Sequence, residues 1–591
     1  MKNKAIRESL GIVVMLAFIF SVVWCGKSEE RKAHRLERQV ERTLKKMSTR
    51  EKVAQLMVSQ TDSYIFSDKH ALLTDTLVGM EGIGGLLIIQ DSLPRYLNRM
   101  NELQAMSKVP MLVSIDGEWG PSMRFGEFPF FPQQMQLGAL SDDSLIYEMG
   151  LAVAEQCEMV NIHINYAPVV DININPKNPV IHARSFGEDR DKVTQFARAY
   201  MQGMQDGGIV ACSKHFPGHG DTEVDSHKGL PVLPFSRERL DSMELYPFRD
   251  QIKEGVKMVM MGHLHIPALD SAVSSISYPI VTGLLKEELG FDGVVVTDAL
   301  TMKGVSENME SADIALAAYK AGVDILLKPG DIIASIDRLE EAMKSGECDI
   351  EDLNNRVRKV LRMKAEFGML DRGYSAHVDT TDISNRVKKE AHIALTRELS
   401  EKTMTLVDNK AGMIPLDASK RIAYVAYNAK HIPLHREYGD IEGLSGYNPA
   451  TGMVDSTTLM YQHLLKETIK QEGEVHYFAL DKKSSKADIV AVEKHLKDYD
   501  VVILACHDPR GRSRKDLIHA DHMDILGKLV KKHHPILVHF GSPYGLAELP
   551  WMEELGGVLV GYQDSENNQR AAAKVLTGEI EAQGVLPVSI R

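Results

Sequence analysis

At 591 residues the chain is too long for one ordinary hydrophobic core, so we expect two large domains or three smaller ones. Hydrophobic residues make up 44% and charged residues 26% of the sequence, which is typical of globular proteins and excludes disordered and fibrous chains. The formal net charge of −13 argues against a nucleic-acid partner, because proteins that bind phosphate backbones present clustered lysine and arginine.

The first 25 residues have the pattern of an export signal. Basic residues precede an apolar run over residues 10–24, which is shorter than the roughly 20 residues that a membrane-spanning helix needs. Cys25 follows at once, so we expect a lipoprotein-type signal peptide over residues 1–25 and attachment to a membrane through a lipid anchor. Because Trp24 is bulkier than signal processing prefers, a cleaved soluble protein and an uncleaved anchor stay open as alternatives. All three predict an exported protein, in the periplasm or on the outer membrane or cell surface.

Short apolar runs alternate with amphipathic stretches from residue 35 to residue 371. Continuous apolar character is typical of strands in a parallel sheet that is covered on both faces. The predicted strands are residues 54–58, 85–89, 111–115, 165–172, 209–214, 257–262, 293–297 and 324–327. Eight strand–helix units of this length predict an α/β fold, namely a TIM-type (β/α)8 barrel. The first run is the weakest, because Ser48 and Glu51 start a capped helix that can extend into it.

The pattern changes after residue 371. Residues 372–400 are predicted as a linker helix, and residues 401–591 as a second domain, an α/β sandwich with a layered sheet. Its strand-like runs are residues 403–407, 422–427, 475–480, 501–505, 535–540 and 557–561. This part has neither a GxGxxG segment after a strand nor a Walker motif, so we do not expect it to bind nucleotides.

Ionisable residues recur where the predicted barrel strands end. Barrel enzymes build their active sites at the carboxyl ends of the strands, so this recurrence predicts an active site at that end of the barrel. The residues in these positions are Asp116, Asp171, Lys214, His215, His263, His265 and Asp298.

The segment over residues 214–227 contains a lysine and three histidines besides acidic residues, and these side chains are suited to acid/base chemistry. It contains KHFPGHGDT (214–222) and DSH (225–227). One residue separates Asp225 from His227, so an extended backbone would point both side chains to the same side. A carboxylate beside an imidazole holds one ring nitrogen and raises the basicity of the other, which makes His227 a candidate general acid/base. Asp298 would open onto the same face of the barrel, where a carboxylate can act as a nucleophile and form a covalent glycosyl intermediate.

These motifs closely resemble the signature of family 3 glycoside hydrolases of the bacterial β-N-acetylglucosaminidase branch. Further matching segments occur in the family's order, and they are SIDGE (114–118), FP (131–132), NYAPVVD (165–171), RSFG (184–187) and VTDA (296–299). The resemblance spans the first domain and implies a retaining mechanism, with Asp298 as nucleophile and the Asp225–His227 dyad as acid/base.

The resemblance also implies a substrate. It predicts an exo-acting enzyme that removes terminal non-reducing N-acetylglucosamine from glycans or peptidoglycan fragments, with no metal and no organic cofactor. The residues expected to hydrogen-bond this sugar are Asp116, Arg124, Arg184, Lys214 and His215. Two departures from the family's pattern put the shape of the sugar subsite in doubt: His182, and the Glu-Trp-Gly segment at residues 118–120.

Three other functions stay open. Within the same fold the protein can be a β-glucosidase or β-xylosidase, or a phosphorylase, since a histidine acid/base repels phosphate less than a carboxylate does. In a different class it would be an inactive glycan-binding lipoprotein on the cell surface, although a binder has no need of Asp298, Asp225 and His227 together. A metal site among the histidines is disfavoured, because no carboxylate lies at a recognisable spacing for metal ligation. The sequence gives no prediction of oligomeric state.

Overall fold

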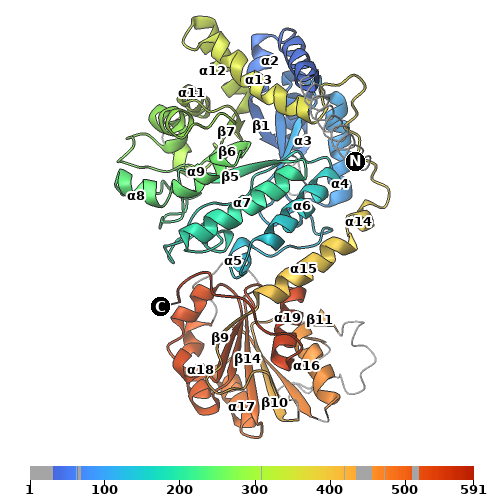
Figure 1. Ribbon diagram of the computed structural model, residues 1–591, viewed down its shortest axis with the longest axis vertical. Coiled ribbons are helices and arrows are strands. Elements are labelled where there is room, and N and C mark those ends of the chain that lie inside the picture. Colours follow the sequence, from blue (N-terminus) through green and yellow to red (C-terminus); the bar gives the residue numbers. More distant parts are fainter. Residues whose placement is uncertain are drawn as a thin grey trace, which may run out of the picture.

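The computed structural model describes residues 31–590, apart from residues 62, 64–67, 308, 418, 431, 434–455, 472 and 509–517. It contains two α/β domains, one above the other in Figure 1. The predicted signal peptide with Cys25 lies outside the described residues. Within the described part of the chain, no helix combines the length and the apolar character needed to cross a bilayer.

The first domain is built on a ring of parallel strands. They pair in the order β7-β6-β5-β4-β3-β2-β1-β8, and backbone hydrogen bonds from Ile325 N to Val295 O (3.0 Å) and from Thr297 N to Ile325 O (3.1 Å) join β7 to β8. The strands are β1 (Met57–Gln60), β2 (Gly85–Ile88), β3 (Leu112–Ile115), β4 (Ile164–Asn165), β5 (Val210–Phe216), β6 (Met258–Met261), β7 (Val294–Thr297) and β8 (Leu326–Leu327). The predicted (β/α)8 barrel is therefore confirmed.

Amphipathic helices surround the barrel and bury their apolar faces against it (Figure 1). The longer ones are α4 (Leu93–Met106), α6 (Ser144–Glu158), α7 (Arg190–Asp206), α9 (Tyr246–Lys253), α11 (Ser311–Ala321), α12 (Ile332–Ser345) and α13 (Ile350–Glu366). Helix α3 (Asp68–Thr76) differs, because Thr74 is its buried residue and its leucines are exposed. Helices α6 and α7 touch where Gly150 meets Gly203, and a Cβ atom on Gly203 would lie 2.3 Å from the Tyr147 carbonyl oxygen. Glycine at this crossing lets the two backbones approach closely.

Two strand predictions had the wrong boundaries. The capped helix that begins after Ser48 runs on to Ala54, so the first strand starts only at Met57 rather than at residue 54. The predicted strand over residues 165–172 is paired regularly only at Ile164–Asn165. Beyond Asn165 the chain stays beside β5 through separate hydrogen bonds, from Lys214 N to Pro168 O (3.2 Å) and from Val170 N to Lys214 O (2.8 Å), because Pro168 has no N–H to continue a regular ladder.

The second domain has a sheet in the order β13-β10-β14-β15-β16-β9, parallel except for β9. Successive residues of β10 alternate between two cores: Ala423 and Val425 face helices α17 and α18, while Ile422 and Tyr424 face α16 and α19. The strands are β9 (Thr405–Asp408), β10 (Arg421–Tyr427), β13 (Glu474–Leu480), β14 (Val501–His507), β15 (Ile536–Phe540) and β16 (Gly557–Val560); the helices are α16 (Leu459–Ile469), α17 (Lys486–Leu496), α18 (Ala520–His533) and α19 (Glu566–Thr577). This is the layered α/β sandwich that was predicted.

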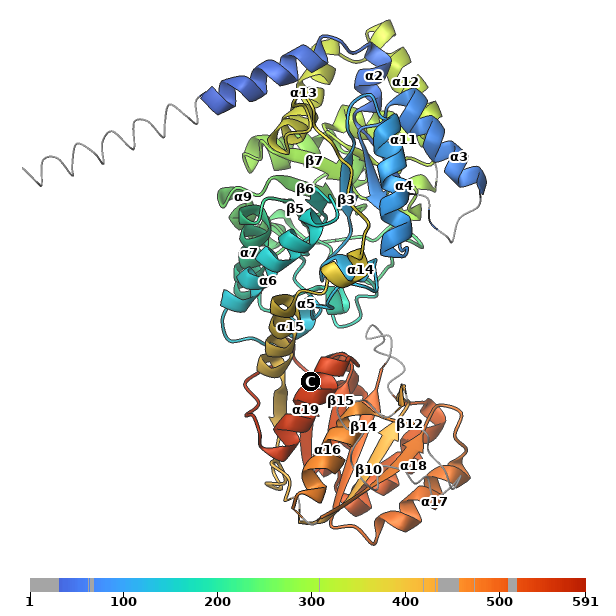
Figure 2. The same ribbon diagram turned by 90° about the vertical axis from the view of Figure 1, so that its right-hand side faces the viewer.

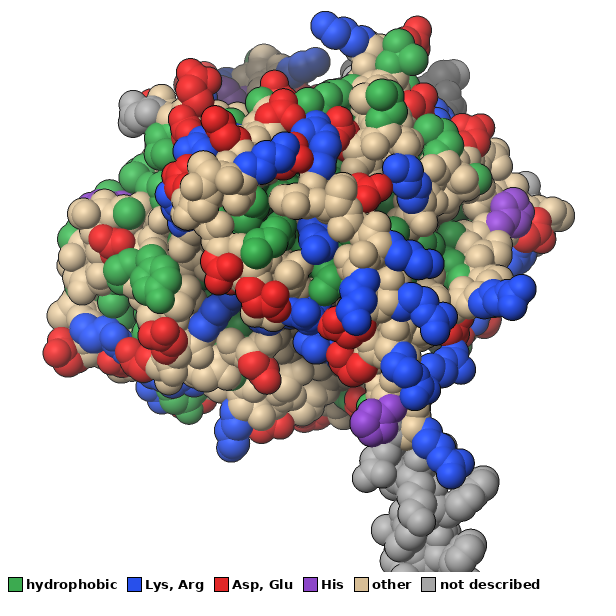
Figure 3. Space-filling model, turned by 90° about the horizontal axis from the view of Figure 1, so that it is seen from above, with side chains coloured by type: hydrophobic (Ala, Val, Ile, Leu, Met, Phe, Trp, Pro, Cys, Tyr) green, Lys and Arg blue, Asp and Glu red, His purple; other side chains and the backbone are tan. Residues whose placement is uncertain are grey.

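Helix α15 (Glu390–Thr403) connects the domains, preceded by the short α14 (Ile383–Arg386). The second domain packs against the barrel through buried polar contacts, for example from Gln136 Nε2 to Thr403 Oγ1 (2.9 Å) and from Gln133 N to Gln563 Oε1 (2.8 Å). A helix over residues 31–44 lies at the far end of the barrel (Figure 2). On that end of the molecule, acidic and basic side chains are interspersed (Figure 3).

Candidate active site

One cavity of about 490 Å³ opens at the carboxyl ends of the barrel strands, and we call it the barrel pocket. Its volume suits a small-molecule ligand. All eight residues predicted to be catalytic or sugar-binding line it: Asp116, Arg124, Arg184, Lys214, His215, Asp225, His227 and Asp298. The residues predicted from scattered motifs therefore meet in one place.

Lys214 is the centre of an ionic cluster in the pocket. Its Nζ atom lies 2.5 Å from Asp116 Oδ1 and 2.8 Å from Glu118 Oε1, and only 2% of its side chain is exposed. Arg124 Nη2 donates to the other oxygen of Asp116 (2.8 Å), and Arg184 Nη2 donates to Glu118 Oε1 (2.6 Å). Each cation is thus held by a carboxylate and has a fixed direction, which is what recognition of sugar hydroxyls requires.

The acidic and basic side chains of the Lys214 cluster stay ionised. Burial alone would raise the pKa values of Asp116 and Glu118, but Lys214 and the arginines outweigh it and hold both pKa values well below the ordinary range. Burial likewise opposes the charge of Lys214, and attraction to Asp116 and Glu118 overcomes it, so the pKa of Lys214 is raised. Asp116 and Glu118 are therefore carboxylates, and Lys214 an ammonium group, at neutral pH.

Glu118 was not predicted as a site residue. Its side chain is 1% exposed, so it acts on Lys214 and Arg184 rather than on a ligand. The available signal was its place two residues after Asp116 in the SIDGE segment, where a strand end had already been predicted.

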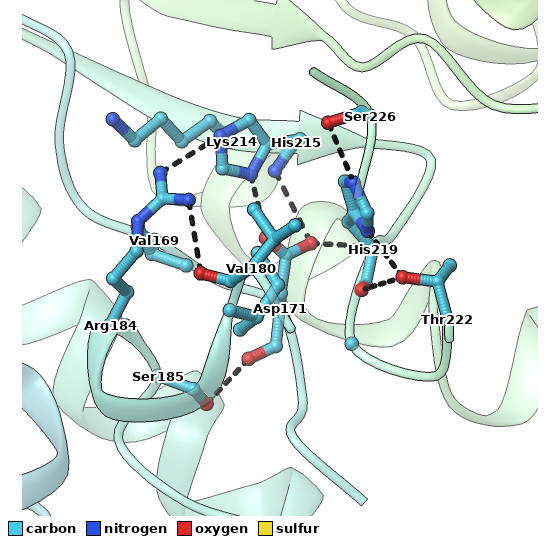
Figure 4. A network of polar contacts seen from close by, with 12 residues as sticks. Val169, Asp171, Val180, Arg184, Ser185, Lys214, His215, His219, Thr222 and Ser226 are labelled. Carbon is cyan, nitrogen blue, oxygen red and sulfur yellow. Dashed lines mark hydrogen bonds and ion pairs between the residues drawn. The ribbon is translucent and has the colours of Figure 1, made fainter. Parts of the chain in front are cut away.

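Asp171 orients the two histidines of the KHFPGH segment (Figure 4). Its Oδ2 atom lies 2.7 Å from His215 Nδ1, and its Oδ1 atom accepts a hydrogen bond from His219 N (2.7 Å). With Nδ1 bound to Asp171, His215 Nε2 faces Arg184 Nη2 at 3.3 Å. A carboxylate in this place fixes the imidazole ring, so we assign Asp171 as a positioning residue for His215.

Replacement of Asp171 by asparagine tests this role. We expect kcat/KM to fall by about 10- to 100-fold, mainly through KM, because the His215 ring loses the acceptor that fixes it. The amide oxygen can still accept from His219 N, so the melting temperature should stay close to that of the wild type. An equal fall in kcat with KM unchanged would contradict the assignment.

Asp298 stands directly after β7, with its backbone nitrogen bonded to Met261 O (2.9 Å) and its Oδ1 atom accepting from Ala299 N (2.7 Å). Burial alone would raise the pKa of Asp298, but His215, His263 and the Ala299 N–H outweigh it and lower the pKa below the ordinary value. A carboxylate that stays ionised in a pocket wall is suited to nucleophilic attack.

The Asp225–His227 pair lies on a loop at the pocket rim. Asp225 Oδ1 accepts from His227 N (2.9 Å) and lies 2.9 Å from His227 Nδ1. The loop is a turn rather than the extended backbone that we predicted, because Lys228 N and Gly229 N both bond to Asp225 O. The pair still forms, and the two hydrogen bonds from His227 outweigh the effect of burial and lower the pKa of Asp225. With Nδ1 occupied, Nε2 of this exposed imidazole remains for a ligand.

Two further pocket residues were missed. Lys328 follows β8 directly, and a prediction that extended one residue past this strand would have included it. His182 had been noted only as a departure from the family's pattern. Its ring lies 5.3 Å from that of Tyr544 and its Nε2 atom 3.5 Å from Ser542 Oγ, so its position depends on the second domain. No local pattern in the sequence indicates that contact.

The fold and the pocket define a (β/α)8-barrel protein with a charged pocket at the carboxyl ends of its strands and an accessory α/β domain. Residues 48–363 match the glycosyl hydrolase family 3 N-terminal domain, and residues 404–591 match the C-terminal domain of the same family. The chain therefore belongs to glycosyl hydrolase family 3.

Two curated proteins and one solved structure illustrate what this chain is similar to. The chain is 31% identical over 384 residues to β-hexosaminidase A of Pseudoalteromonas piscicida, a match that covers 59% of this chain and 63% of that protein. It is 32% identical over 330 residues to β-hexosaminidase LpqI of Mycobacterium tuberculosis, covering 54% and 83%. A solved family 3 β-N-acetylglucosaminidase from Paenibacillus sp. FPU-7 is 28% identical with a TM-score of 0.75, covering 92% of this chain and 99% of that one.

Proposed function

We propose that this protein is an exo-acting, retaining β-N-acetylglucosaminidase. The observation that carries the proposal is that Asp298 and the Asp225–His227 dyad line the same pocket as the Lys214 cluster. The relatives named β-hexosaminidase and the solved β-N-acetylglucosaminidase support the choice of sugar. The substrates we propose are glycans or peptidoglycan fragments that end in N-acetylglucosamine.

The mechanism that we propose has two steps. Asp298 attacks the anomeric carbon while His227 Nε2 gives its proton to the glycosidic oxygen, so the leaving sugar departs as an alcohol and a glycosyl–Asp298 ester forms. His227 then takes a proton from water, which attacks the anomeric carbon and frees Asp298. Two displacements restore the original anomeric configuration. Asp225 orients the imidazole in both steps.

Exo action fits the charged end of the pocket. Asp116, Lys214 and Arg184 are tied to one another and to the buried Glu118, and they form a polar wall against which the distal hydroxyls of one sugar can end. A chain that continued beyond this sugar would have to displace these ion pairs. Because partners left unpaired in such a cluster are costly, we expect cleavage of single terminal residues.

Replacing His227 by alanine tests the dyad. We expect kcat/KM for N,N′-diacetylchitobiose to fall by about a hundredfold or more, because the leaving sugar is then expelled without a proton. The fall should be smaller for the p-nitrophenyl glycoside, whose leaving group needs no protonation. Equal rates for wild type and variant on both substrates would contradict the assignment. The matched control is His377→Ala, which removes an exposed histidine that does not line the pocket.

The same assay separates the alternatives. Faster cleavage of the p-nitrophenyl glucoside or xyloside than of the N-acetylglucosaminide would favour a β-glucosidase or β-xylosidase. Formation of a sugar 1-phosphate on addition of phosphate would identify a phosphorylase. Binding of N-acetylglucosamine without turnover of any glycoside would leave the inactive glycan-binding protein. Mass spectrometry of the mature N-terminus tests lipidation of Cys25, export and membrane attachment.

A further inference from the structure

His263 lies behind the wall of the barrel pocket, two residues after the end of β6. Only 1% of it is exposed, and it is not among the described residues that line the pocket. We therefore do not expect a bound sugar to contact it. The strand-end pattern predicted His263 at the active-site end of the barrel, but the two-step mechanism does not use it.

Both ring nitrogens of His263 have a partner. Nδ1 lies 2.7 Å from Ser275 Oγ, and Nε2 lies 3.1 Å from Ala299 O. A carbonyl oxygen can only accept, so Nε2 carries the proton and donates it to Ala299 O. Burial lowers the pKa of His263, and neither the attraction of Asp298 nor the hydrogen bond to Ala299 offsets this effect. The ring is therefore neutral at pH 7, and Nδ1 accepts from the Ser275 hydroxyl.

The chain on either side of His263 is tied to the segment that carries Ser275. The neighbouring Ser274 is fully buried, and its Oγ atom donates to Gly262 O (2.7 Å) and accepts from Leu264 N (3.0 Å). One buried serine thus holds the residues before and after His263, and the next serine fixes its tautomer. The imidazole is a fixed donor rather than a mobile side chain.

Ala299 is the residue through which His263 acts on Asp298. Its carbonyl oxygen accepts from His263 and also from Met302 N (2.9 Å), which closes a turn. Its N–H donates to Asp298 Oδ1 (2.7 Å). No hydrogen bond joins Oδ2 of Asp298 to another residue in the described part of the chain, so this oxygen is the one left for the anomeric carbon.

We propose that His263, in the tautomer fixed by Ser275, is a positioning residue for the nucleophile Asp298. It holds the turn that begins at Ala299, and this turn holds the carboxylate in the orientation for attack. The inference rests on the proposed function and adds to it a residue that the substrate does not touch. A reacting oxygen must be held to within about 0.5 Å of its productive position, so loss of the anchor should slow the reaction without weakening substrate binding.

Two substitutions of His263 separate the donor from the ring. A glutamine amide nitrogen reaches the position of Nε2 and can still donate to Ala299 O, whereas an asparagine amide reaches only the position of Nδ1. We expect His263→Asn to lower kcat for N,N′-diacetylchitobiose by about 10- to 100-fold, with KM within about twofold of the wild type. His263→Gln should retain at least about a third of kcat. Ser275→Ala should lower kcat by about fivefold, because one hydrogen bond to the ring is lost.

The loss in His263→Asn should not depend on the leaving group. Asp298 has to attack the p-nitrophenyl glycoside just as it attacks the disaccharide, so kcat/KM should fall by a similar factor on both substrates. This behaviour differs from that expected for His227→Ala, in which the p-nitrophenyl glycoside is less affected. The comparison therefore separates a residue that acts on the nucleophile from one that acts on the acid/base.

The controls separate positioning from a merely structural role. A structural role would lower the melting temperature and the amount of folded enzyme, and glutamine would then be no better than asparagine. His377→Asn, which removes an exposed histidine that does not line the pocket, should leave kcat and melting temperature unchanged. Equal kcat values for His263→Asn and His263→Gln, or a loss confined to KM, would overturn the inference.

Failure of the proposed function gives a different result, because the wild type then cleaves neither substrate. Amide hydrogen exchange over residues 299–302, measured by mass spectrometry, reads the anchor without any turnover. His263→Asn should exchange faster there than the wild type, and His263→Gln should exchange at the wild-type rate. Unchanged exchange in His263→Asn overturns the inference whether or not the protein is a glycosidase.

Discussion

Replacing Asp298 by asparagine is expected to reduce kcat/KM for an N-acetylglucosaminide by at least about a thousandfold. The carboxylate is the only nucleophile that we assign, and an amide oxygen in its place forms no stable ester with the anomeric carbon. The fold should persist, since the amide oxygen can still accept from Ala299 N. Asp292→Asn is the matched control, because Asp292 is exposed just before the other end of β7. Steady-state rates and melting temperatures check both variants.

Azide identifies which step each variant has lost. In Asp298→Ala the space on the α face is free, so azide should attack an activated aryl glycoside there and give an α-glycosyl azide. In His227→Ala the glycosyl–Asp298 ester should still form, so azide should attack from the β face and give a β-glycosyl azide. The same anomer from both variants, or an Asp298→Asn enzyme with near wild-type rates, would contradict the assignment of nucleophile and acid/base.

The sequence was sufficient to predict the barrel because its signal is local. Continuous apolar runs such as 293–297 indicate a strand that is buried on both faces. An ionisable residue directly after such a run indicates the end of the barrel at which the active site lies. Runs near a competing local signal had the wrong boundaries. The capping box at Ser48 extended a helix into the first predicted strand, and regular pairing of the fourth ended at Asn165, ahead of Pro168.

The pairings inside the site were harder to predict, since they join residues far apart in the chain. Asp116 and Lys214 are separated by 98 positions, and Glu118 and Arg184 by 66. Only closure of the barrel brings them together, so the sequence indicated which residues line the pocket but not that Glu118 holds two of its cations. The contact of His182 with Ser542 and Tyr544 depends on how the domains dock, for which local patterns carry no information.

The second large effect is expected when Lys214 is replaced, and it concerns stability as well as activity. Replacing it by methionine leaves the carboxylates of Asp116 and Glu118 close together without the ammonium group between them. Breaking a buried ion pair by removing one partner costs about 3–5 kcal/mol, which corresponds to a fall of roughly 6–10 °C in melting temperature for a domain of this size. We also expect kcat/KM to fall by about a hundredfold or more, because a sugar ligand is lost. Lys303→Met, which removes an exposed lysine that does not line the pocket, is the control and should change neither quantity.

The pH dependence separates lost charge from lost packing around Lys214. In the wild type, Asp116 and Glu118 have folded-state pKa values below their ordinary 3.8 and 4.5, so they stabilise the fold above pH 5 and lose this contribution as the pH falls through the folded-state values. In Lys214→Met their pKa values rise towards the ordinary range, and protonation as the pH falls relieves the repulsion between them. The difference in melting temperature should therefore be largest at pH 7 and shrink as the pH is lowered. The double variant Lys214→Met/Glu118→Gln, with one charge fewer, should recover part of the loss at pH 7. A difference that is independent of pH and insensitive to Glu118→Gln would indicate a packing defect, and the charge balance of the pocket would then not explain why Lys214 is buried.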